Sequence, residues 1–486
     1  MDYLDRAGDG RIGDAQAEMI TSSAFAGKKY AVLGLARSGA ASVEALLASG
    51  AEVTAWDRQD VARDPFAGRC ELADPLEMDL TGFDGLVVSP GVPLNTHPIV
   101  AHAAKYGVPV IGDIELFALA RADLPPHKVV GITGTNGKST TTALVHHILA
   151  EAGVPSLMGG NIGLPIMSQI PLQPNANGEG VYVLELSSYQ IDLSYSLDCD
   201  VAVLLNITPD HLDRYDGFEA YGASKERLFE MQSLESPSIV GEHIWRHSKP
   251  FYDRWQEKKY WQLLCMPDVN SDNPFDYDDW PERSLSAQSQ WPSLQGPHNW
   301  ENALAAIMVC QSIGLGDAQI AAGLETFKGL EHRMERTATH AGVLYVNDSK
   351  ATNQASTAPA LAAFPPEPAI HGGSPRIHWI VGGLAKEDGL GECAEHLANI
   401  ACAYTIGEAG PRFAEMLEPS VPVIRAELMQ DAIAQAKAKA QSGDVILLSP
   451  ACASFDQFRD FEKRGEHFRS VVSALIEQDA DEGKAA

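Results

Sequence analysis

The chain has 486 residues, of which 36 are Lys or Arg and 65 are Asp or Glu, so its formal net charge is −29. This length suggests about three domains, and a hydrophobic content of 45% with 42 glycines is typical of a globular protein rather than a disordered or fibrous one. The strong negative charge disfavours a general nucleic-acid binder, because it repels phosphate backbones, and no run of apolar residues is long enough to span a membrane.

The N-terminal residues 1–26 contain four aspartates and no apolar core, so we do not expect them to form a secretory signal. Seven cysteines are dispersed along the chain without a CxxC pair. Such a pattern favours reduced thiols over a disulfide framework or a zinc site. We therefore expect a cytoplasmic protein.

The first predicted region begins with an apolar strand at 29–33, followed by a glycine-bounded turn, a helix over 40–48 and a second strand over 51–57. An acidic residue, Asp57, ends the second strand, as is common in nucleotide-binding βαβ units. The glycine spacing does not match GxGxxG, so the motif alone does not indicate a dinucleotide. Another strand begins at Leu86 and ends in a tight turn around Gly91. No catalytic signature is present, and this pattern predicts a binding domain.

The second region follows a break at Pro125-Pro126. A strand over 129–132 leads directly into the loop Gly134-Thr135-Asn136-Gly137-Lys138-Ser139, and helical sequence follows over 143–150. Loop amides and a helix N-terminus can hold phosphates, Lys138 can neutralise their charge, and Ser139 can coordinate Mg²⁺. The strict P-loop pattern would require a glycine at position 132, which is Ile132. The alternative is a glycine-rich turn with an exposed lysine.

Polar residues follow the next two predicted strands, 181–186 and 201–205. Glu185 lies at the end of the first, where ligands of α/β proteins bind, and could hold magnesium or be a solvated side chain. His211 follows the second and could bind metal or substrate or be structural, while Asp210 and Asp213 could be helix caps. By composition, Lys225 is an ordinary helix lysine beside Glu226.

Two asparagines, Asn299 and Asn302, lie one turn apart at the start of a predicted helix over 303–310. They can share a face toward a purine or ribose, although Asn299 could also cap the helix. Residues 241–296 hold five of the eight tryptophans and an acidic segment. We interpret this stretch as a variable peripheral insert and assign it no chemical role.

The third predicted region contains strands over 344–346, 377–381 and 445–448 with alanine-rich helices between them, which indicates an α/β fold in all three regions. Arg333 lies where this region begins. Polar or small residues follow each strand, at 347–353, at Lys386 and at 449–458. Each segment could be a solvated loop, but their shared placement favours a ligand site suited to a carboxylate.

Together these motifs resemble the Mur ligases of peptidoglycan synthesis. The resemblance is carried, in family order and spacing, by residues 134–139, 184–190, 210–214, 225, 298–302, 332–333, 348–352 and 449–461. It extends over residues 27–475 and is weakest over 241–296. Residues 184–188 and 449–454 favour the members of the family that add D-glutamate.

The resemblance implies a three-domain α/β fold. A Rossmann-like UDP-substrate domain would cover 27–122, after an extension over 1–26. A P-loop ATPase domain would cover 123–329, and a Rossmann-like amino-acid domain 330–486.

The resemblance also implies roles for individual residues. For ATP it implies Gly134, Thr135, Asn136, Gly137, Lys138, Ser139, Thr140, Asn299, Asn302, Arg333 and Asp348. Near the uridine nucleotide it implies Gly34, Asp57, Arg58 and Gly91, and for the muramoyl substrate Asn161. His211 is a further implied substrate-binding residue. For D-glutamate it implies Lys350, Thr352, Lys386, Ser454 and Phe461. For magnesium it implies Ser139, Glu185, His211 and Lys225, the last as a carbamylated lysine, which replaces our first interpretation of that residue. Lys138, Glu185, His211 and Lys225 are the implied catalytic set.

The implied reaction is an ATP-dependent amide ligation of UDP-N-acetylmuramoyl-L-alanine and D-glutamate through an acyl phosphate, with ATP and two magnesium ions as cofactors. We expect a monomer, since no heptad or exposed apolar stripe occurs, and neither nucleic acid nor membrane as partner. Two alternatives stay open. The chain could be a sister amide ligase, such as another Mur ligase or folylpolyglutamate synthase, or a regulator that binds a nucleotide sugar without catalysis.

Overall fold

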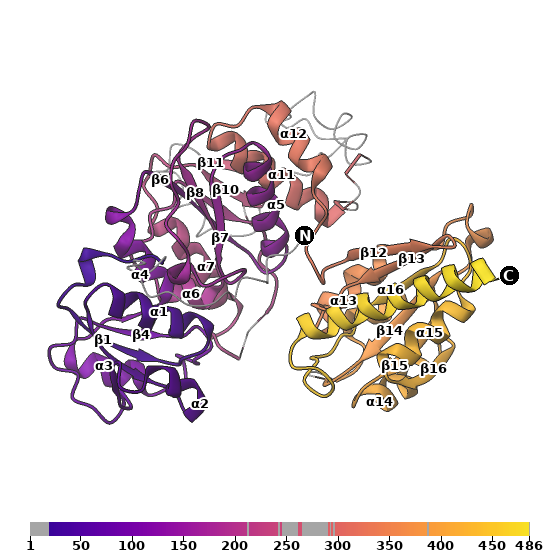
Figure 1. Ribbon diagram of the computed structural model, residues 1–486, viewed down its shortest axis with the longest axis horizontal. Helices are drawn as coiled ribbons and strands as arrows, with labels where there is room; N and C mark the ends of the chain where they lie inside the picture. Colours follow the sequence, from indigo (N-terminus) through magenta and orange to yellow (C-terminus); the bar gives the residue numbers. More distant parts are fainter. Residues whose placement is uncertain are drawn as a thin grey trace. The chain divides into compact units, whose positions relative to one another are not determined.

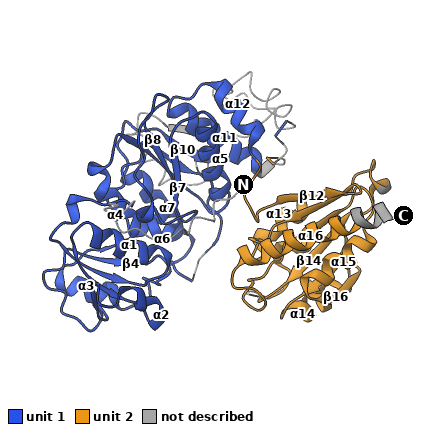
Figure 2. Ribbon diagram, in the orientation of Figure 1, with its two compact units in different colours: residues 1–291, 297–327 blue, residues 292–296, 328–486 orange. Residues whose placement is uncertain are grey.

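The computed structural model describes residues 19–210, 213–241, 244, 261–264, 290–291, 293–294, 297–385 and 388–485. The strands form three separate sheets of five, six and six strands (Figure 1). The chain divides into two compact units, shown in Figure 2, with the second beginning in the main at Lys328. The first two sheets belong to unit 1 and the third to unit 2. No helix of the described residues combines the length and the apolar character needed to cross a bilayer.

The first sheet of unit 1 is parallel, with strand order β3-β2-β1-β4-β5. Its central strands are buried and hydrophobic, as expected for a parallel sheet covered by helices on both faces. The strands are β1 (Lys29–Leu33), β2 (Glu52–Trp56), β3 (Glu71–Leu72), β4 (Gly85–Val88) and β5 (Val110–Ile111). The helices are α1 (Arg37–Ala48), α2 (Asp60–Arg63), α3 (Ile99–Tyr106) and α4 (Asp113–Ala120).

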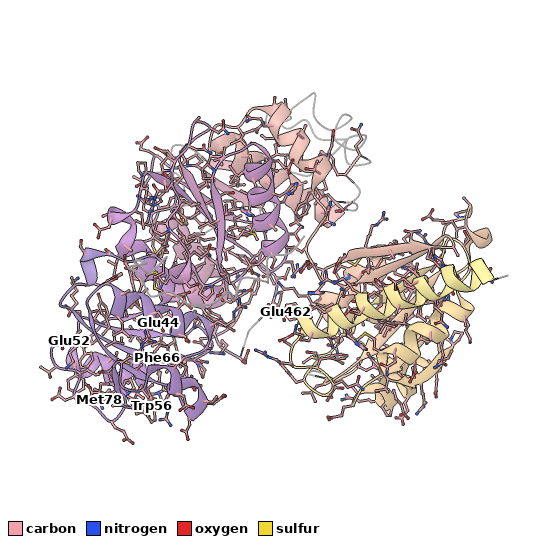
Figure 3. All side chains as sticks on the ribbon, in the orientation of Figure 1. Glu44, Glu52, Trp56, Phe66, Met78 and Glu462 are labelled. Carbon is pink, nitrogen blue, oxygen red and sulfur yellow. The ribbon has the colours of Figure 1, made fainter. Side chains whose placement is uncertain are left out.

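Two arginines next to this sheet contact a glutamate and an aromatic ring. Arg69 donates to Glu44 Oε1 on α1 at 2.6 Å, beside the buried ring of Phe66, and the Arg63 guanidinium lies 4.0 Å from the Trp56 ring centroid. Glu44, Trp56 and Phe66 are labelled in Figure 3. Such exposed pairs stabilise the fold only slightly, so the packed rings matter more than the charges.

The described end of the N-terminal extension, residues 19–26, packs onto the first sheet. Ile20 and Phe25 are fully buried in the core that this sheet shares with the next one. Ser22 Oγ and Ser23 Oγ donate to Asp123 Oδ2 at 2.7 and 2.8 Å. The segment is therefore tied to the point where the chain leaves the first sheet.

The middle sheet is also parallel, with strand order β11-β10-β9-β6-β8-β7. The strands are β6 (His127–Thr133), β7 (Ser156–Gly160), β8 (Gly180–Glu185), β9 (Val201–Leu204), β10 (Ser238–Gly241) and β11 (Trp261–Leu264). The helices are α5 (Lys138–Glu151), α6 (Ser188–Asp192), α7 (Phe218–Glu230), α11 (Pro297–Ser312) and α12 (Asp317–Thr326). Because β8, β6 and β9 are parallel neighbours, the loops that follow them leave the sheet at one edge.

Helix α5 begins at Lys138, five residues before the position predicted from the sequence. Threonines weaken a helix prediction because their branched side chains lose rotamer freedom in a helix. Here Thr140, Thr141 and Thr142 are buried within α5, so packing compensates for the low propensity.

The sheet of unit 2 has strand order β12-β13-β17-β14-β15-β16, and only the edge strand β12 is antiparallel. Its strands are β12 (Glu335–His340), β13 (Val343–Asn347), β14 (Ile377–Gly382), β15 (Ile400–Ile406), β16 (Val423–Glu427) and β17 (Val445–Leu448). The helices are α13 (Gln354–Ala362), α14 (Gly410–Leu417), α15 (Met429–Lys439) and α16 (Phe461–Ala485).

Candidate active site

The loop between β6 and α5 is shaped by two glycines with positive φ. Gly134 has φ +153° and Gly137 has φ +82°, conformations that side-chain-bearing residues rarely adopt. A β-carbon at Gly137 would clash with Asn302 Oδ1 on α11. The loop is therefore confined, and its glycines allow the tight turn into α5 that a phosphate-binding loop requires.

An asparagine that sequence reasoning did not select holds this loop in place. Asn206, just after β9, accepts from the Asn136 amide through Oδ1 at 2.7 Å and donates from Nδ2 to Asn136 O at 3.1 Å. Its own carbonyl accepts from the Thr135 amide at 2.9 Å. The only sequence signal was its place directly after a predicted strand.

Two lysines converge on one carbonyl of the loop. Lys138 Nζ donates to Gly134 O at 2.9 Å and to Thr135 O at 2.7 Å. Lys225 Nζ, from α7, donates to the same Gly134 O at 2.9 Å. Two ammonium groups so close together create a local positive field, even though the whole chain is strongly acidic.

Lys225 is almost completely buried, with 2% of its surface exposed. Burial first, and the neighbouring Lys138 ammonium second, lower the pKa of Lys225 to about 7, and nearby carboxylates oppose the shift only in part. The Tyr221 ring covers its ammonium at 4.8 Å. Near neutral pH a substantial share of Lys225 is therefore a neutral amine, which can act as a nucleophile.

Glu185, the last residue of β8, has one satisfied and one unsatisfied oxygen. Oε1 accepts from Asn161 Nδ2 at 3.0 Å, whereas Oε2 is buried without a hydrogen-bond partner. Leaving a buried carboxylate oxygen unpaired is costly, so this oxygen is suited to a cation. Within the described part of the chain, no cluster of three or more His, Cys, Asp or Glu forms a metal cage, and magnesium typically needs only one or two carboxylates. His211 lies outside the described residues.

The two asparagines of α11 lie on the face that meets the loop. Asn302 is buried, accepts from Thr141 Oγ1 at 3.2 Å through Oδ1, and donates to Asn299 Oδ1 at 3.3 Å. Asn299 and Asn302 therefore share one face of α11, as their spacing predicts, and this face lies beside the predicted phosphate loop.

The residues assigned to the uridine nucleotide lie at the carboxyl edge of the first sheet. Gly34 follows β1 with φ +88°, and its carbonyl accepts from Ser89 Oγ at 2.7 Å. The Asp57 carboxylate accepts from the amides of Leu35 and Gln59 at 2.7 and 2.9 Å. Asp57 thus shapes the turn, and Arg58 follows it directly. Gly91, in the turn after β4, is linked to the middle sheet through its carbonyl, which accepts from Arg214 Nη2 at 3.0 Å.

In unit 2, predicted residues surround the carboxyl ends of β13 and β17. Asp348 is buried, and burial raises its pKa to about 7, although Ser449 Oγ and the Met334 amide donate to it at 2.7 and 3.1 Å. The Lys350 ammonium lies 5.7 Å from the Phe461 ring centroid. The structure thus brings Lys350 and Phe461 together, and Lys350 lies two residues after Asp348 in the chain.

The other predicted residues of unit 2 are placed less completely. Ser454 is buried in the loop after β17, and its carbonyl accepts from the Phe458 amide at 2.8 Å. Arg333 and Thr352 are both partly buried, Arg333 just before β12 and Thr352 just before α13. Lys386 lies outside the described residues.

Sequence reasoning also missed Arg464 on α16. It is 1% exposed and donates to Ser349 Oγ at 3.0 Å and to Ser349 O at 2.8 Å, while Nη1 has no partner. An arginine in a charged helical stretch usually faces solvent, so the sequence carries no signal for its burial.

Comparison with known proteins identifies relatives over nearly the whole chain. The Mur ligase middle domain matches residues 132–310, and the Mur ligase, glutamate ligase domain matches residues 332–452. The UDP-N-acetylmuramoylalanine–D-glutamate ligase of Novosphingobium aromaticivorans is 59% identical over 94% of this chain and 97% of its own length. The enzymes of the same name from Sphingopyxis alaskensis and Zymomonas mobilis are 56% and 48% identical over 94% of this chain and 100% of their own lengths.

Solved structures show the same fold at low sequence identity. UDP-N-acetylmuramate-alanine ligase from Thermotoga maritima has a TM-score of 0.52 at 15% identity, covering 92% of this chain and 99% of its own. E. coli FolC, solved with DHPP and ADP, has a TM-score of 0.52 at 19% identity, covering 75% and 93%. The predicted α/β fold of three sheets is thus confirmed.

Proposed function

The chain belongs to the Mur ligase family, and from this membership we propose that it joins D-glutamate to UDP-N-acetylmuramoyl-L-alanine at the expense of ATP, in peptidoglycan precursor synthesis. The relatives that share about half or more of its residues over almost its full length carry this activity in their names. We place the reaction in the cytoplasm, where ATP is available, and take the protein to act as a monomer.

The observation that carries the proposal is the convergence of Lys138 and Lys225 on the Gly134 carbonyl, beneath a loop confined by Asn206 and Asn302. A binding protein would need loop amides and one cation for phosphate. A second, buried lysine with a lowered pKa costs stability without improving simple nucleotide binding. Chemistry at the γ-phosphate accounts for it better.

The first step that we propose is phosphoryl transfer. A carboxylate is a poor acyl donor because its oxygen is a poor leaving group, so the terminal alanyl carboxylate takes the γ-phosphoryl group of ATP and releases ADP. The product is an acyl phosphate. Lys138 offsets the charge that gathers on the transferred group, while the loop amides and the α5 N-terminus orient the phosphates.

The second step is amide formation. The neutral amine of D-glutamate attacks the acyl carbon, a tetrahedral intermediate forms, and inorganic phosphate leaves with the C–O bond electrons. The amine must lose a proton, which a group of the protein or a water accepts. Lys350, Thr352, Lys386, Ser454 and Phe461 are the proposed D-glutamate residues, with the lysines pairing its carboxylates.

Magnesium and a modified lysine belong to the same proposal. Ser139, Glu185, His211 and Lys225 would hold two magnesium ions, and the unpartnered Glu185 Oε2 supports a cation there. When bound, the metal would neutralise phosphate charge and help orient the reacting oxygens. Neutral Lys225 would add CO₂ and release one proton, becoming a carbamate that carries an anionic oxygen ligand.

Phosphate release from ATP tests the proposal in the presence of UDP-N-acetylmuramoyl-L-alanine and, in parallel, D-glutamate, L-glutamate, L-lysine or no amino acid. We expect release only with D-glutamate. Release with another amino acid would assign the chain to a sister ligase. Tight ATP binding without release in any mixture would instead indicate a nucleotide-binding regulator.

A further inference from the structure

The turn after β4 is joined to the middle sheet by two hydrogen bonds across the seam within unit 1. Arg214 Nη2 donates to Gly91 O at 3.0 Å, and Asn95 Nδ2 donates to Asp213 O at 2.9 Å. The paired residues are separated by 123 and 118 positions in the chain. Tertiary packing alone therefore brings this turn, which contains a proposed substrate contact, against the residues before α7.

Aromatic rings hold the Arg214 side chain in the direction of the turn. Its guanidinium carbon lies 4.8 Å from the Tyr189 ring centroid, and Tyr189 stacks on Tyr215 with centroids 6.0 Å apart and planes 9° apart. Stacking on a ring restricts a planar guanidinium to one orientation. The donor that reaches Gly91 is thus pre-oriented rather than freely rotating.

The same rings lead to the lysine helix and to the phosphate loop. Tyr215 Oη donates to Asp192 Oδ2 at 2.8 Å, and Ser224 Oγ, next to Lys225, donates to Asp192 Oδ1 at 2.7 Å. The Tyr221 ring lies 5.5 Å from that of Tyr215, and its hydroxyl lies 3.1 Å from Thr135 Oγ1. An unbroken series of contacts thus runs from the Gly91 turn to the loop between β6 and α5.

Arg227 provides an internal comparison. It also lies near a ring, with its guanidinium carbon 5.4 Å from the Tyr195 centroid, and it donates to Asp192 O at 3.2 Å and Ser194 O at 3.0 Å. None of these partners belongs to the turn after β4, although Tyr195 Oη itself donates to Val110 O of the first sheet at 3.1 Å. Arg227 therefore holds α7 against residues 192–195, whereas Arg214 uses the same chemistry to reach the Gly91 turn.

We propose that Arg214 is a positioning residue for the sugar-nucleotide substrate. Through the Gly91 carbonyl it fixes the turn after β4 relative to α7 and the phosphate loop, so that a nucleotide sugar held by the first sheet presents its terminal carboxylate toward the transferring phosphate. Arg214 acts through the turn and takes no part in bond making. This inference rests on the proposed function for the identity of the substrate.

The test compares Arg214→Met with Arg227→Met, which removes a similar ring contact and similar hydrogen bonds but none to the Gly91 turn. Calorimetry measures binding of UDP-N-acetylmuramoyl-L-alanine alone, and phosphate release gives KM for all three substrates. For Arg214→Met we expect Kd and KM for the UDP substrate to rise about tenfold, because the variant loses one hydrogen bond to the turn and one cation–π contact. KM for ATP and for D-glutamate should stay within about twofold of the wild type, since their proposed contacts are unchanged.

Arg214→Lys keeps the charge but loses the planar stack, so it should recover only part of the affinity. Arg227→Met should lower the melting temperature and leave all three KM values unchanged. Asn95→Ala removes only the second hydrogen bond across the seam and leaves the ring stack intact. It should weaken UDP-substrate binding about threefold, and it provides the test if Arg214→Met does not fold.

Unchanged binding of the UDP substrate by Arg214→Met, or an equal change in all three KM values, would overturn the proposal and leave Arg214 as a structural contact. So would unchanged binding by Asn95→Ala if that variant alone folds. A wild-type protein that binds the UDP substrate but releases no phosphate with D-glutamate would overturn the proposed function alone, because the binding comparison would still stand.

Discussion

A buried ionisable side chain with a strongly shifted pKa lies near the carboxyl edge of two sheets, Lys225 at the middle sheet and Asp348 at the sheet of unit 2. Burial shifts both pKa values to about 7, from opposite directions. Their neighbours differ. Lys225 lies beside a second ammonium, which adds to its shift, whereas Asp348 accepts hydrogen bonds from Ser449 and Met334, which oppose its shift.

This difference separates two uses of a buried charge. At Lys225 the neighbouring ammonium strengthens the tendency to lose charge and nearby carboxylates oppose it only in part, which costs stability and is understandable only if the neutral amine has a use. At Asp348 two hydrogen-bond donors lower the cost of burying the carboxyl group, which is what we expect of a carboxyl whose role is to order its own loop. Similar pKa values therefore do not imply similar roles, and variants of the two regions should behave differently.

The largest effect that we expect is for Lys138, the loop lysine whose ammonium adds to the pKa shift of Lys225. Lys138→Met should lower D-glutamate-dependent phosphate release about a thousandfold, because transition-state charge on the phosphoryl group loses its cation. Steady-state phosphate release measures it. Lys128→Met is the matched control, since Lys128 lies on β6 but donates to Ile313 O at 3.2 Å, away from the loop, and should change the rate less than twofold. Similar rates for the two variants would remove Lys138 from the mechanism.

Lys225→Met should separate activity from stability. We expect phosphate release to fall about a hundredfold while the free energy of unfolding at pH 6 rises by a few kcal/mol, because the buried charge is gone. Between about pH 7 and 10.5 the unfolded chain binds a proton on Lys225 that the folded chain has released, so wild-type stability should rise with pH in this window. Urea titrations of both proteins from pH 6 to 10 should show the difference shrinking, and a constant difference would contradict the shift.

Asp348→Asn should show the opposite pH dependence. Between pH 3.8 and about 7 the folded carboxyl keeps a proton that the unfolded chain has lost, so wild-type stability should fall as the pH rises through this window. An amide does not titrate, so the variant should gain on the wild type by at most a few kcal/mol between pH 4 and pH 8. Urea titrations across that range measure the gain. Parallel profiles for the two proteins would mean that Asp348 ionises normally.

Ser449→Ala should give the smallest effect and sharpen the contrast by removing one hydrogen bond to Asp348. We expect a loss of about 1 kcal/mol at pH 8, where the carboxylate needs the donor, and a smaller loss near pH 5. Ser470→Ala is the control, because Ser470 lies exposed on α16, and it should change stability by less than about 0.5 kcal/mol. Equal losses for the two variants at both pH values would show that the hydrogen bond is without consequence.

Several strands that are buried on both faces could be predicted from the sequence, although the buried strand β15 was not. The continuous apolar runs at β6, β8 and β17 mark central parallel strands, and each was predicted within two residues. Strand β16 was not predicted, since as an edge strand it exposes Arg425 and Glu427 and has no apolar run. Edge strands depend on a neighbour for their pairing, and local sequence does not report that neighbour.

In the candidate site, too, local sequence predicts some features, and others depend on residues far away in the chain. The position of Glu185 at a strand end and the turn at Gly137 could be predicted from local sequence, because a strand, a glycine and a helix are neighbours in the chain. The contact of Lys225 with the Gly134 carbonyl spans 91 residues, and the hydrogen bonds of Asn206 to the loop span 70. Long-range packing creates them, and composition predicts only an ordinary helix lysine at 225.

The hydrogen bonds of Ser22 and Ser23 to Asp123 also bear on how the chain folds during synthesis. They join residues 100 and 101 positions apart, so the first described segment to leave the ribosome must wait for about a hundred further residues before its partner exists. Until then the apolar side chains of Ile20 and Phe25 have no completed core to enter. The first described residues of unit 1 therefore gain all of these contacts only after every strand of the first sheet has been translated.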